Sequence, residues 1–87
     1  MARVRVPSVV VSFPSTEAAL ACEDVCERRG LAGRLIPLPG EISAGCGLAW
    51  KAAPELREAL ADALDAEDVA YEAMTYVCLL EFVREGA

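Results

Sequence analysis

Residues 34–52 read RLIPLPGEISAGCGLAWKA, two short apolar runs joined by a long connection rich in proline and glycine. The first run, Arg34–Leu38, predicts a strand near a sheet edge, because Pro37 has no N–H to donate to a ladder. The second run, Gly47–Ala52, predicts the next strand. In the connection, Cys46 lies between two glycines. A strand pair joined by a cysteine-bearing loop is therefore the centre of the predicted fold.

The residues before this pair predict a strand followed by a helix. Val9–Phe13 is rich in β-branched residues and bounded by prolines, so we expect a buried strand, with Val4 as its earliest start. Ser15 is a favourable N-cap for the helix, and Gly30 is a favourable stop. The expected buried face of the helix consists of Ala18, Ala21, Cys22, Val25 and Cys26.

The residues after the pair predict a second helix and a last strand. Pro54 favours a helix start, because its fixed φ suits the first turn. The expected apolar stripe of this helix consists of Leu56, Ala59, Leu60, Ala63 and Leu64. Tyr71 and the apolar run Met74–Val83 then predict the final strand.

The order strand, helix, strand, strand, helix, strand is that of the ferredoxin-like βαββαβ arrangement. We therefore expect one α+β domain over residues 1–87, with a four-stranded antiparallel sheet and two helices on one face.

The last predicted strand, Met74–Val83, is apolar on both of its alternating sets of residues. A strand with one face in water would alternate apolar and polar side chains, so the helix-free face needs a cover. We expect a homodimer through the open sheet face or through the final strand, with Cys46 outside the contact. The alternative is a monomer whose C-terminal segment folds back over its own sheet.

Charge and hydropathy exclude two classes of partner. The chain has 14 acidic and 8 basic residues and a net charge of −6, which opposes binding to nucleic acid. The longest apolar runs are far shorter than the ~20 residues that span a bilayer, and the basic start is followed by too short a run for a signal peptide. We expect a cytoplasmic protein with reduced cysteines.

Cys46 is the candidate functional residue, because we expect its proline- and glycine-rich connection to place the thiol on the surface rather than in the core. Its flanking glycines allow close approach to a ligand and allow backbone N–H groups to turn toward a thiolate or persulfide anion. Ser43, Gly45 and Gly47 are the expected loop support. Arg34 and Lys51 could supply positive charge, whereas Glu41 would oppose a thiolate. The alternative is a loop cysteine whose glycines only serve a turn, with Arg34 and Lys51 simply solvated.

These residues carry a resemblance. Leu35–Pro39, then Ile42-Ser43, then Cys46-Gly47 and the short apolar strand Leu48–Trp50 resemble the selenium/sulfur carrier protein-like family. The resemblance extends over about residues 9–71 and implies a thiol that carries sulfur or selenium. One position departs from the family pattern, because Gly40 stands where the family often has a basic residue.

The other cysteines are interpreted as packing residues. Cys22 and Cys26 lie one helical turn apart on the apolar face, where a disulfide is disfavoured and free cysteine behaves as a small hydrophobe. Cys78 lies in an apolar strand and is expected in the core. The four cysteines lack the paired spacing of a structural zinc site, and the chain has no histidine for a Cys-His nucleophile. We predict no metal and no cofactor.

The leading hypothesis is therefore a carrier or accessory protein rather than a stand-alone enzyme. Cys46 would accept sulfur or selenium as a persulfide or selenosulfide from a donor enzyme and pass it to an acceptor enzyme. One alternative is a non-catalytic ferredoxin-like binding or regulatory module, since this fold hosts many roles. Another is thiol redox chemistry, which would need Cys22, Cys26 or Cys78 within bridging distance of Cys46.

Overall fold

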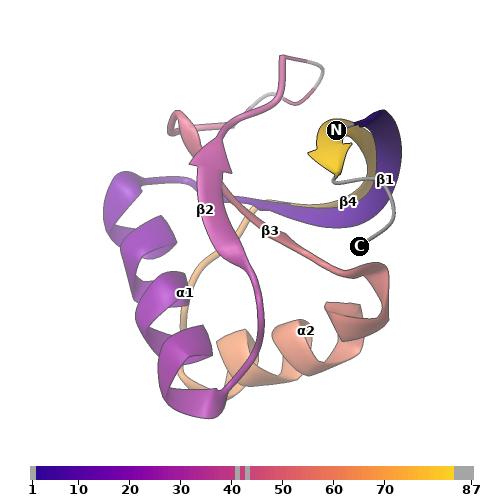
Figure 1. Ribbon diagram of the computed structural model, residues 1–87. Helices are drawn as coiled ribbons and strands as arrows, with labels where there is room; N and C mark the ends of the chain where they lie inside the picture. The colour runs from indigo at the N-terminus through magenta and orange to yellow at the C-terminus, as the bar shows by residue number, and fades with distance from the viewer. Residues whose placement is uncertain (1, 41, 43, 84–87) are drawn as a thin grey trace.

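The computed structural model describes residues 2–40, 42 and 44–83. The elements follow in the order β1 (Ala2–Ser12), α1 (Thr16–Arg29), β2 (Arg34–Pro37), β3 (Leu48–Ala52), the 3-10 turn η1 (Pro54–Leu56), α2 (Arg57–Ala66) and β4 (Ala73–Val83). The strands form one antiparallel sheet in the order β2-β3-β1-β4, and both helices pack on the same side of it (Figure 1). The predicted α+β ferredoxin-like fold is confirmed.

Helix α1 begins and ends where its capping residues predict. The Ser15 side chain accepts a hydrogen bond from the Ala18 N–H at 3.2 Å, and Gly30 ends the helix with a left-handed φ of 69°. The face that it buries consists of Ala19, Cys22, Val25 and Cys26. The prediction of Ala21 in this face was wrong, since Ala21 is exposed and Ala19 takes its place. Neighbouring alanines are equally hydrophobic, so periodicity alone did not distinguish them.

Helix α2 starts later than Pro54. The proline opens a single 3-10 turn, and the α-helix begins only at Arg57. Leu60, Ala63 and Leu64 are buried as predicted, but Ala59 is exposed, so that part of the predicted stripe was wrong. Ala59 lies at the flank of the buried stripe, where a methyl group gains little from burial.

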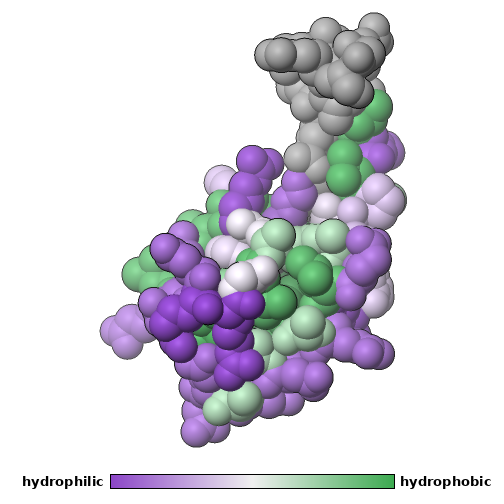
Figure 2. All heavy atoms as spheres, turned by 60° about the horizontal axis from the view of Figure 1, so that its bottom comes forward, coloured by the Kyte–Doolittle hydropathy of each residue, from purple (hydrophilic) through white to green (hydrophobic). Residues whose placement is uncertain are grey.

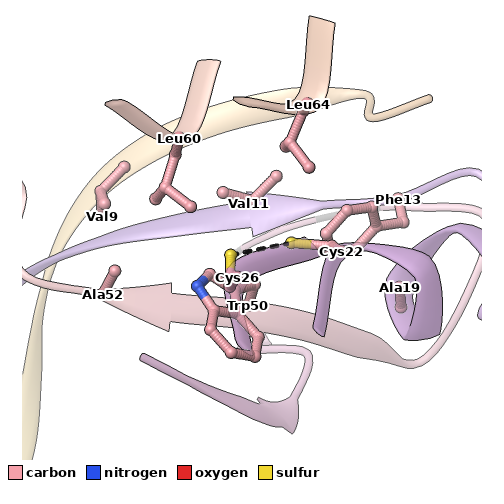
Figure 3. Packing of buried hydrophobic residues seen from close by; sticks show 10 residues of the cluster. All are labelled: Val9, Val11, Phe13, Ala19, Cys22, Cys26, Trp50, Ala52, Leu60 and Leu64. Carbon is pink, nitrogen blue, oxygen red and sulfur yellow. Dashed lines mark hydrogen bonds between the residues drawn. The ribbon is translucent and has the colours of Figure 1, made fainter. Parts of the chain in front are cut away.

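The core lies between the sheet and the two helices. Side chains from β1, α1, β3 and α2 meet there in one cluster (Figure 3), and its largest fully buried members are Phe13, Leu60 and Leu64. Burial of a side chain of this size stabilises the folded state by about 1.5 to 3 kcal/mol. Trp50 extends this core from β3 and is only 4% exposed. All four of these elements therefore contribute to one cluster of buried side chains among the described residues.

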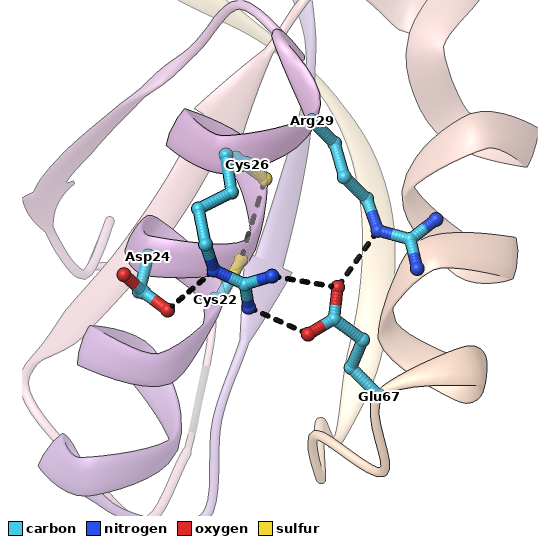
Figure 4. Close-up of polar contacts among 6 residues, drawn as sticks. Cys22, Asp24, Cys26, Arg29 and Glu67 are labelled. Atoms are coloured by element: carbon cyan, nitrogen blue, oxygen red, sulfur yellow. Dashed lines mark hydrogen bonds and ion pairs between the residues drawn. The ribbon is translucent and has the colours of Figure 1, made fainter.

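A surface clamp joins the C-terminal end of α1 to the end of α2. The carboxylate of Glu67 accepts hydrogen bonds from Arg28 Nη2 at 2.5 Å and from Arg29 Nε at 2.8 Å, and Arg28 Nε also contacts Asp24 at 3.0 Å (Figure 4). These hydrogen bonds, those from Arg28 foremost, hold the pKa of Glu67 below its ordinary value. The stabilisation of the folded state by these ion pairs is complete at pH values above the ordinary pKa of glutamate. It is lost as the pH falls through the lowered pKa of Glu67.

β1 and β4 pair along their whole length, from Ala2 opposite Val83 to Ser12 opposite Ala73. β3 pairs only with the last part of β1, from Val9 to Ser12. Residues 2–8 of β1 therefore have a partner on one side only, and with β4 they form a curled two-stranded arm (Figure 1). We had predicted the strand from Val9, or at the earliest from Val4, and it is longer.

Seen from below, hydrophobic and near-neutral surface gathers in the middle of the molecule with hydrophilic side chains around it (Figure 2).

Candidate functional site

The candidate site is the loop between β2 and β3, which stands at one end of the sheet (Figure 1). The ladder between these strands ends at Pro37 opposite Leu48. One further backbone hydrogen bond, from the Leu38 N–H to the Gly47 carbonyl at 2.8 Å, closes the base of the loop. Gly47 thus supports the loop through its carbonyl. Ser43 and Glu41, which the sequence also suggested for this site, lie outside the described residues.

The Cys46 side chain is less exposed to solvent than the sequence predicted. We had predicted a surface thiol, but the Cys46 side chain is half-buried and packs against the edge of the core cluster. Its Sγ donates a hydrogen bond to the Leu48 carbonyl at 3.3 Å. The thiol is therefore positioned by the start of β3, and it must give up this weak bond before the sulfur can act as a nucleophile.

Gly45 is the residue that seats the loop against the rest of the molecule. A Cβ at this position would overlap the Pro14 carbonyl oxygen and would lie 3.0 Å from the Pro14 carbonyl carbon. Only glycine fits so close an approach of two backbones. The segment that follows β1 therefore fixes the position of the residue next to Cys46.

Glu72 is a residue of this site that sequence reasoning missed. Its carboxylate accepts a hydrogen bond from the Gly45 N–H at 3.2 Å, and its own N–H donates to the Ser12 carbonyl at 2.7 Å. The sequence suggested that the Gly45 N–H could turn toward a thiolate or persulfide anion at Cys46. The backbone donor is occupied by a carboxylate, an anion supplied by the chain itself.

Arg34 and Lys51 lie at the other end of the β2-β3 ladder. They stand directly opposite each other, three residue pairs from Pro37 and Leu48. That separation is about 10 Å along the strands. The structure thus brings the two cations to each other, and it does not bring their backbones to the cysteine loop.

The chain that forms this fold and this loop has a match among known protein families. The family described as Putative Se/S carrier protein-like matches residues 8–76, which is most of the chain. The chain belongs to this family. Neither a curated protein nor a solved structure matches it. The matched range holds all of β3, both helices and the whole Cys46 loop, and it reaches into β4.

Two cysteines of this selenium/sulfur carrier-like chain are packing residues, as expected. Cys22 and Cys26 are fully buried on α1, with their sulfurs 4.0 Å apart (Figure 3). Burial raises the pKa of Cys22, and the neighbouring Cys26 raises it further. Burial also raises the pKa of Cys26. A thiol that holds its proton this firmly is a poor nucleophile at neutral pH.

Cys78 does not lie in the core. The prediction of a core position was wrong, because Cys78 is exposed on β4. An apolar run indicates burial only when both faces of its strand are covered, and among the described strands β4 is an edge strand that pairs only with β1. The carrier-like chain thus offers two thiols that solvent can reach among the described residues, Cys46 and Cys78.

Two kinds of feature are absent from the described part of the chain, a metal-binding cluster and a helix that could span a bilayer. Within it, no three or more His, Cys, Asp or Glu side chains are placed to hold a metal ion. Neither α1 nor α2 has the length and hydrophobicity of a bilayer-spanning helix.

Proposed function

We propose that this member of the selenium/sulfur carrier-like family carries sulfur or selenium on Cys46. The Cys46 thiolate attacks the outer sulfur of a persulfide on a donor enzyme. A new S–S bond forms to Cys46, the old S–S bond breaks, and the donor cysteine leaves as a thiolate. The proton of Cys46 passes to solvent, and no electrons enter or leave. A nucleophile on an acceptor enzyme then takes the outer sulfur and returns the Cys46 thiolate.

The observation that carries this proposal is the way the Cys46 loop is seated. Gly45 lies tight against Pro14 and is tied to Glu72, so the neighbouring thiol has a defined place at the end of the sheet. Cys78 is more exposed, but it sits on an open strand edge without a loop around it. A carrier needs a thiol that a partner can approach in one orientation, and Cys46 meets that need better.

The Glu72 carboxylate adds a feature to the proposal. At rest this carboxylate accepts the hydrogen bond of the Gly45 N–H. When a persulfide forms, its terminal sulfur is an anion that can accept the same N–H, and Glu72 moves into solvent. The Gly45 N–H is therefore bound to Glu72 in the resting loop and to the persulfide in the loaded loop.

The test is mass spectrometry after incubation with a cysteine desulfurase and cysteine. We expect the mass to rise by one sulfur atom, with the change mapped to Cys46 and reversed by a thiol reductant. Cys46→Ser abolishes the change, whereas the matched variant Cys78→Ser keeps it. Loading that persists in Cys46→Ser, or that maps to Cys78, would overturn the proposal.

We also propose a homodimer that forms through the free edge of β4. This strand has 11 residues, is bordered by β1 alone and contains neither lysine nor proline, the residues that most often protect an edge. Its surface includes Tyr76, which is 61% exposed. Two copies of one edge can pair antiparallel about a two-fold axis. Cys46 belongs to a loop of β2 and β3, so it stays outside this contact.

The dimer proposal has a geometric test. Cys78 is the midpoint of β4, so a full two-fold pairing places the two Cys78 residues opposite each other, with Cα atoms about 4.5 to 5.5 Å apart. That spacing allows a disulfide. Diamide oxidises two thiols to a disulfide and takes up their two hydrogens. It should therefore link the two copies covalently through their Cys78 residues. In Tyr76→Cys combined with Cys78→Ser, the new cysteines are about 13 Å apart and should not link. A strictly monomeric mass by light scattering would refute the dimer.

A further inference from the structure

The first half of β1 has a vacant strand position beside it. β3 pairs with β1 only as far as Val9 opposite Ala52, and the chain then turns away into η1. Among the described strands, the arm of residues 2–8 therefore pairs with β4 on one side and with nothing on the other. The arm curls away from both helices (Figure 1). A two-stranded ribbon outside a core is marginally stable in water, so a third strand would stabilise it.

A cavity of about 380 Å³ marks the inner end of this vacant strand position. Its lining includes residues 6–8 of the arm, Ala52 at the end of β3 and Leu56 of η1. Ala52 and Leu56 pack with the core on the helix side, whereas Val6 belongs to the other face, because strand residues alternate and Val9 is a core residue. An opening lined from both faces lies in the plane of the sheet, where a further strand would continue the line of β3.

Backbone groups of the arm face the vacant strand position. Pro7 has no N–H, and a sheet accommodates a proline where its nitrogen faces an unpaired side. Because successive residues direct their backbone groups to alternate sides, Arg3 and Arg5 also direct their N–H and C=O groups away from β4. An extended chain laid beside the arm therefore meets a row of hydrogen-bond donors and acceptors.

The side chains of the arm define what such a chain must contain. Arg5 is exposed and makes no hydrogen bond or ion pair with any described residue, and the neighbouring Val4 is 37% exposed. Residues 2–8 contain two arginines and no acidic residue, in a chain with a net charge of −6. A residue directly opposite Arg5 on a third strand lies within reach of its charge, so an acidic residue is favoured there. Apolar residues are favoured opposite Val4 and Val6.

We propose that the vacant strand position binds an extended segment of a partner protein in which acidic and apolar residues alternate. Main-chain hydrogen bonds to the arm supply the affinity, and Arg5 selects the acidic positions. The arm of a second copy does not fit, because pairing about a two-fold axis at Arg5 would set two arginines opposite each other. Binding does not depend on sulfur carriage, since the Cys46 loop contacts Pro14, beyond the other end of β1.

The probe is a fluorescein-labelled peptide with the sequence Val-Glu-Val-Glu-Val-Glu-Val, and binding is measured by fluorescence anisotropy. We expect one peptide per chain with a dissociation constant of about 10 to 100 µM. N-methylation of the glutamate nitrogens removes the donors that face Arg5 and should abolish binding. Methylation of two inner valine nitrogens is the matched control and should leave the affinity unchanged. Equal binding of the two methylated peptides overturns the proposal.

A charge reversal tests the part played by Arg5. A peptide with lysine in place of glutamate should bind the wild type at least about tenfold more weakly. Arg5→Glu should reverse this preference, so that the lysine peptide binds about tenfold more tightly than the glutamate peptide. Cys46→Ser should bind both peptides as the wild type does. An unchanged preference in Arg5→Glu contradicts the assignment of the segment to the arm.

Amide hydrogen exchange, followed by NMR, shows which edge the peptide occupies. At saturation the glutamate peptide should slow exchange of the Arg5 amide at least about tenfold. Cys78 is the direct partner of Pro7, so its N–H faces the free edge of β4, and its exchange should stay the same. Slower exchange at Cys78 instead of Arg5 refutes the proposal and places the segment on β4. Protection of Arg5 that rises with protein concentration in the absence of peptide refutes it as well and assigns the position to a second copy.

Discussion

Cysteine occurs in this chain in two contrasting settings, the middle of α1 and the loop before β3. Cys22 and Cys26 are fully buried, and burial raises the pKa of each thiol. Cys46 is half-buried, packs only against the rim of the same core and is tied to the backbone by a single weak hydrogen bond. The comparison teaches that burial, rather than residue type, separates packing thiols from a thiol that can do chemistry.

The largest difference expected between the two settings is the rate of thiol labelling. Under native conditions an aromatic disulfide reagent should modify Cys78 and Cys46, while Cys22 and Cys26 react only when the core opens. If that opening costs about 5 kcal/mol, the buried pair reacts more than about 10³-fold more slowly. Mass spectrometry of tryptic peptides over time measures the ratio. Equal rates for Cys22 and Cys46 would remove the distinction on which the proposed function rests.

The second prediction tests how the loop is seated. Gly45→Ala places a Cβ against the Pro14 backbone and should destabilise the fold by about 1 to 3 kcal/mol. Gly47→Ala is the matched control, since a Cβ there meets nothing within 4 Å. We expect it to change the free energy of unfolding by less than about 1 kcal/mol, with stabilisation the more natural direction. Urea denaturation measures both, and similar losses in the two variants would contradict the seating of the loop at Gly45.

The third prediction compares the same substitution in the two settings. Cys22→Ser buries a hydroxyl in an apolar core and should cost about 1 to 2 kcal/mol of unfolding free energy. Cys46→Ser changes a half-buried side chain that can keep its bond to the Leu48 carbonyl, so its cost should be below about 0.5 kcal/mol. Thermal and urea unfolding give these values. A larger cost for Cys46→Ser than for Cys22→Ser would show that the loop thiol is structural.

The smallest expected effect is in alkaline solution. Because its folded pKa is raised above the ordinary 9.0, Cys22 keeps its proton in the folded state. Its contribution to stability is complete below about pH 9 and declines as pH rises toward the folded pKa, with a slope of at most about 1.4 kcal/mol per pH unit. Cys22→Ala should flatten this decline in the free energy of unfolding between pH 9 and 10. If the free energy of unfolding changes with pH in the same way in the wild type and in Cys22→Ala, the raised pKa of Cys22 is contradicted.

Much of the fold could be predicted from the sequence, because local signals agree with one another. Ser15 and Gly30 cap α1 as expected, and the runs around residues 34–52 form the predicted hairpin. The misses come from properties that a single sequence does not contain. Cys78 is exposed because of the place of β4 in the sheet, and Glu72 meets Gly45 because the ends of distant segments lie side by side. Arg34 and Lys51 could support Cys46 only if the fold brought them close, and strand register places their backbones at the other end of the β2-β3 ladder.

The pairing of the first strand with the last has a consequence for how the chain acquires its structure. Ala2 lies opposite Val83, so the longest ladder of the sheet joins segments from the two ends of the described chain. Such contacts need the largest loop closure and form late in folding. During synthesis, α1, β2 and β3 can assemble on the inner part of β1 before β4 has left the ribosome. The edge of β1 that receives β4 is then open, and a chaperone or a second nascent chain could pair with it. The exposure of that edge before β4 arrives, rather than the stability of the finished fold, sets the risk of aggregation during synthesis.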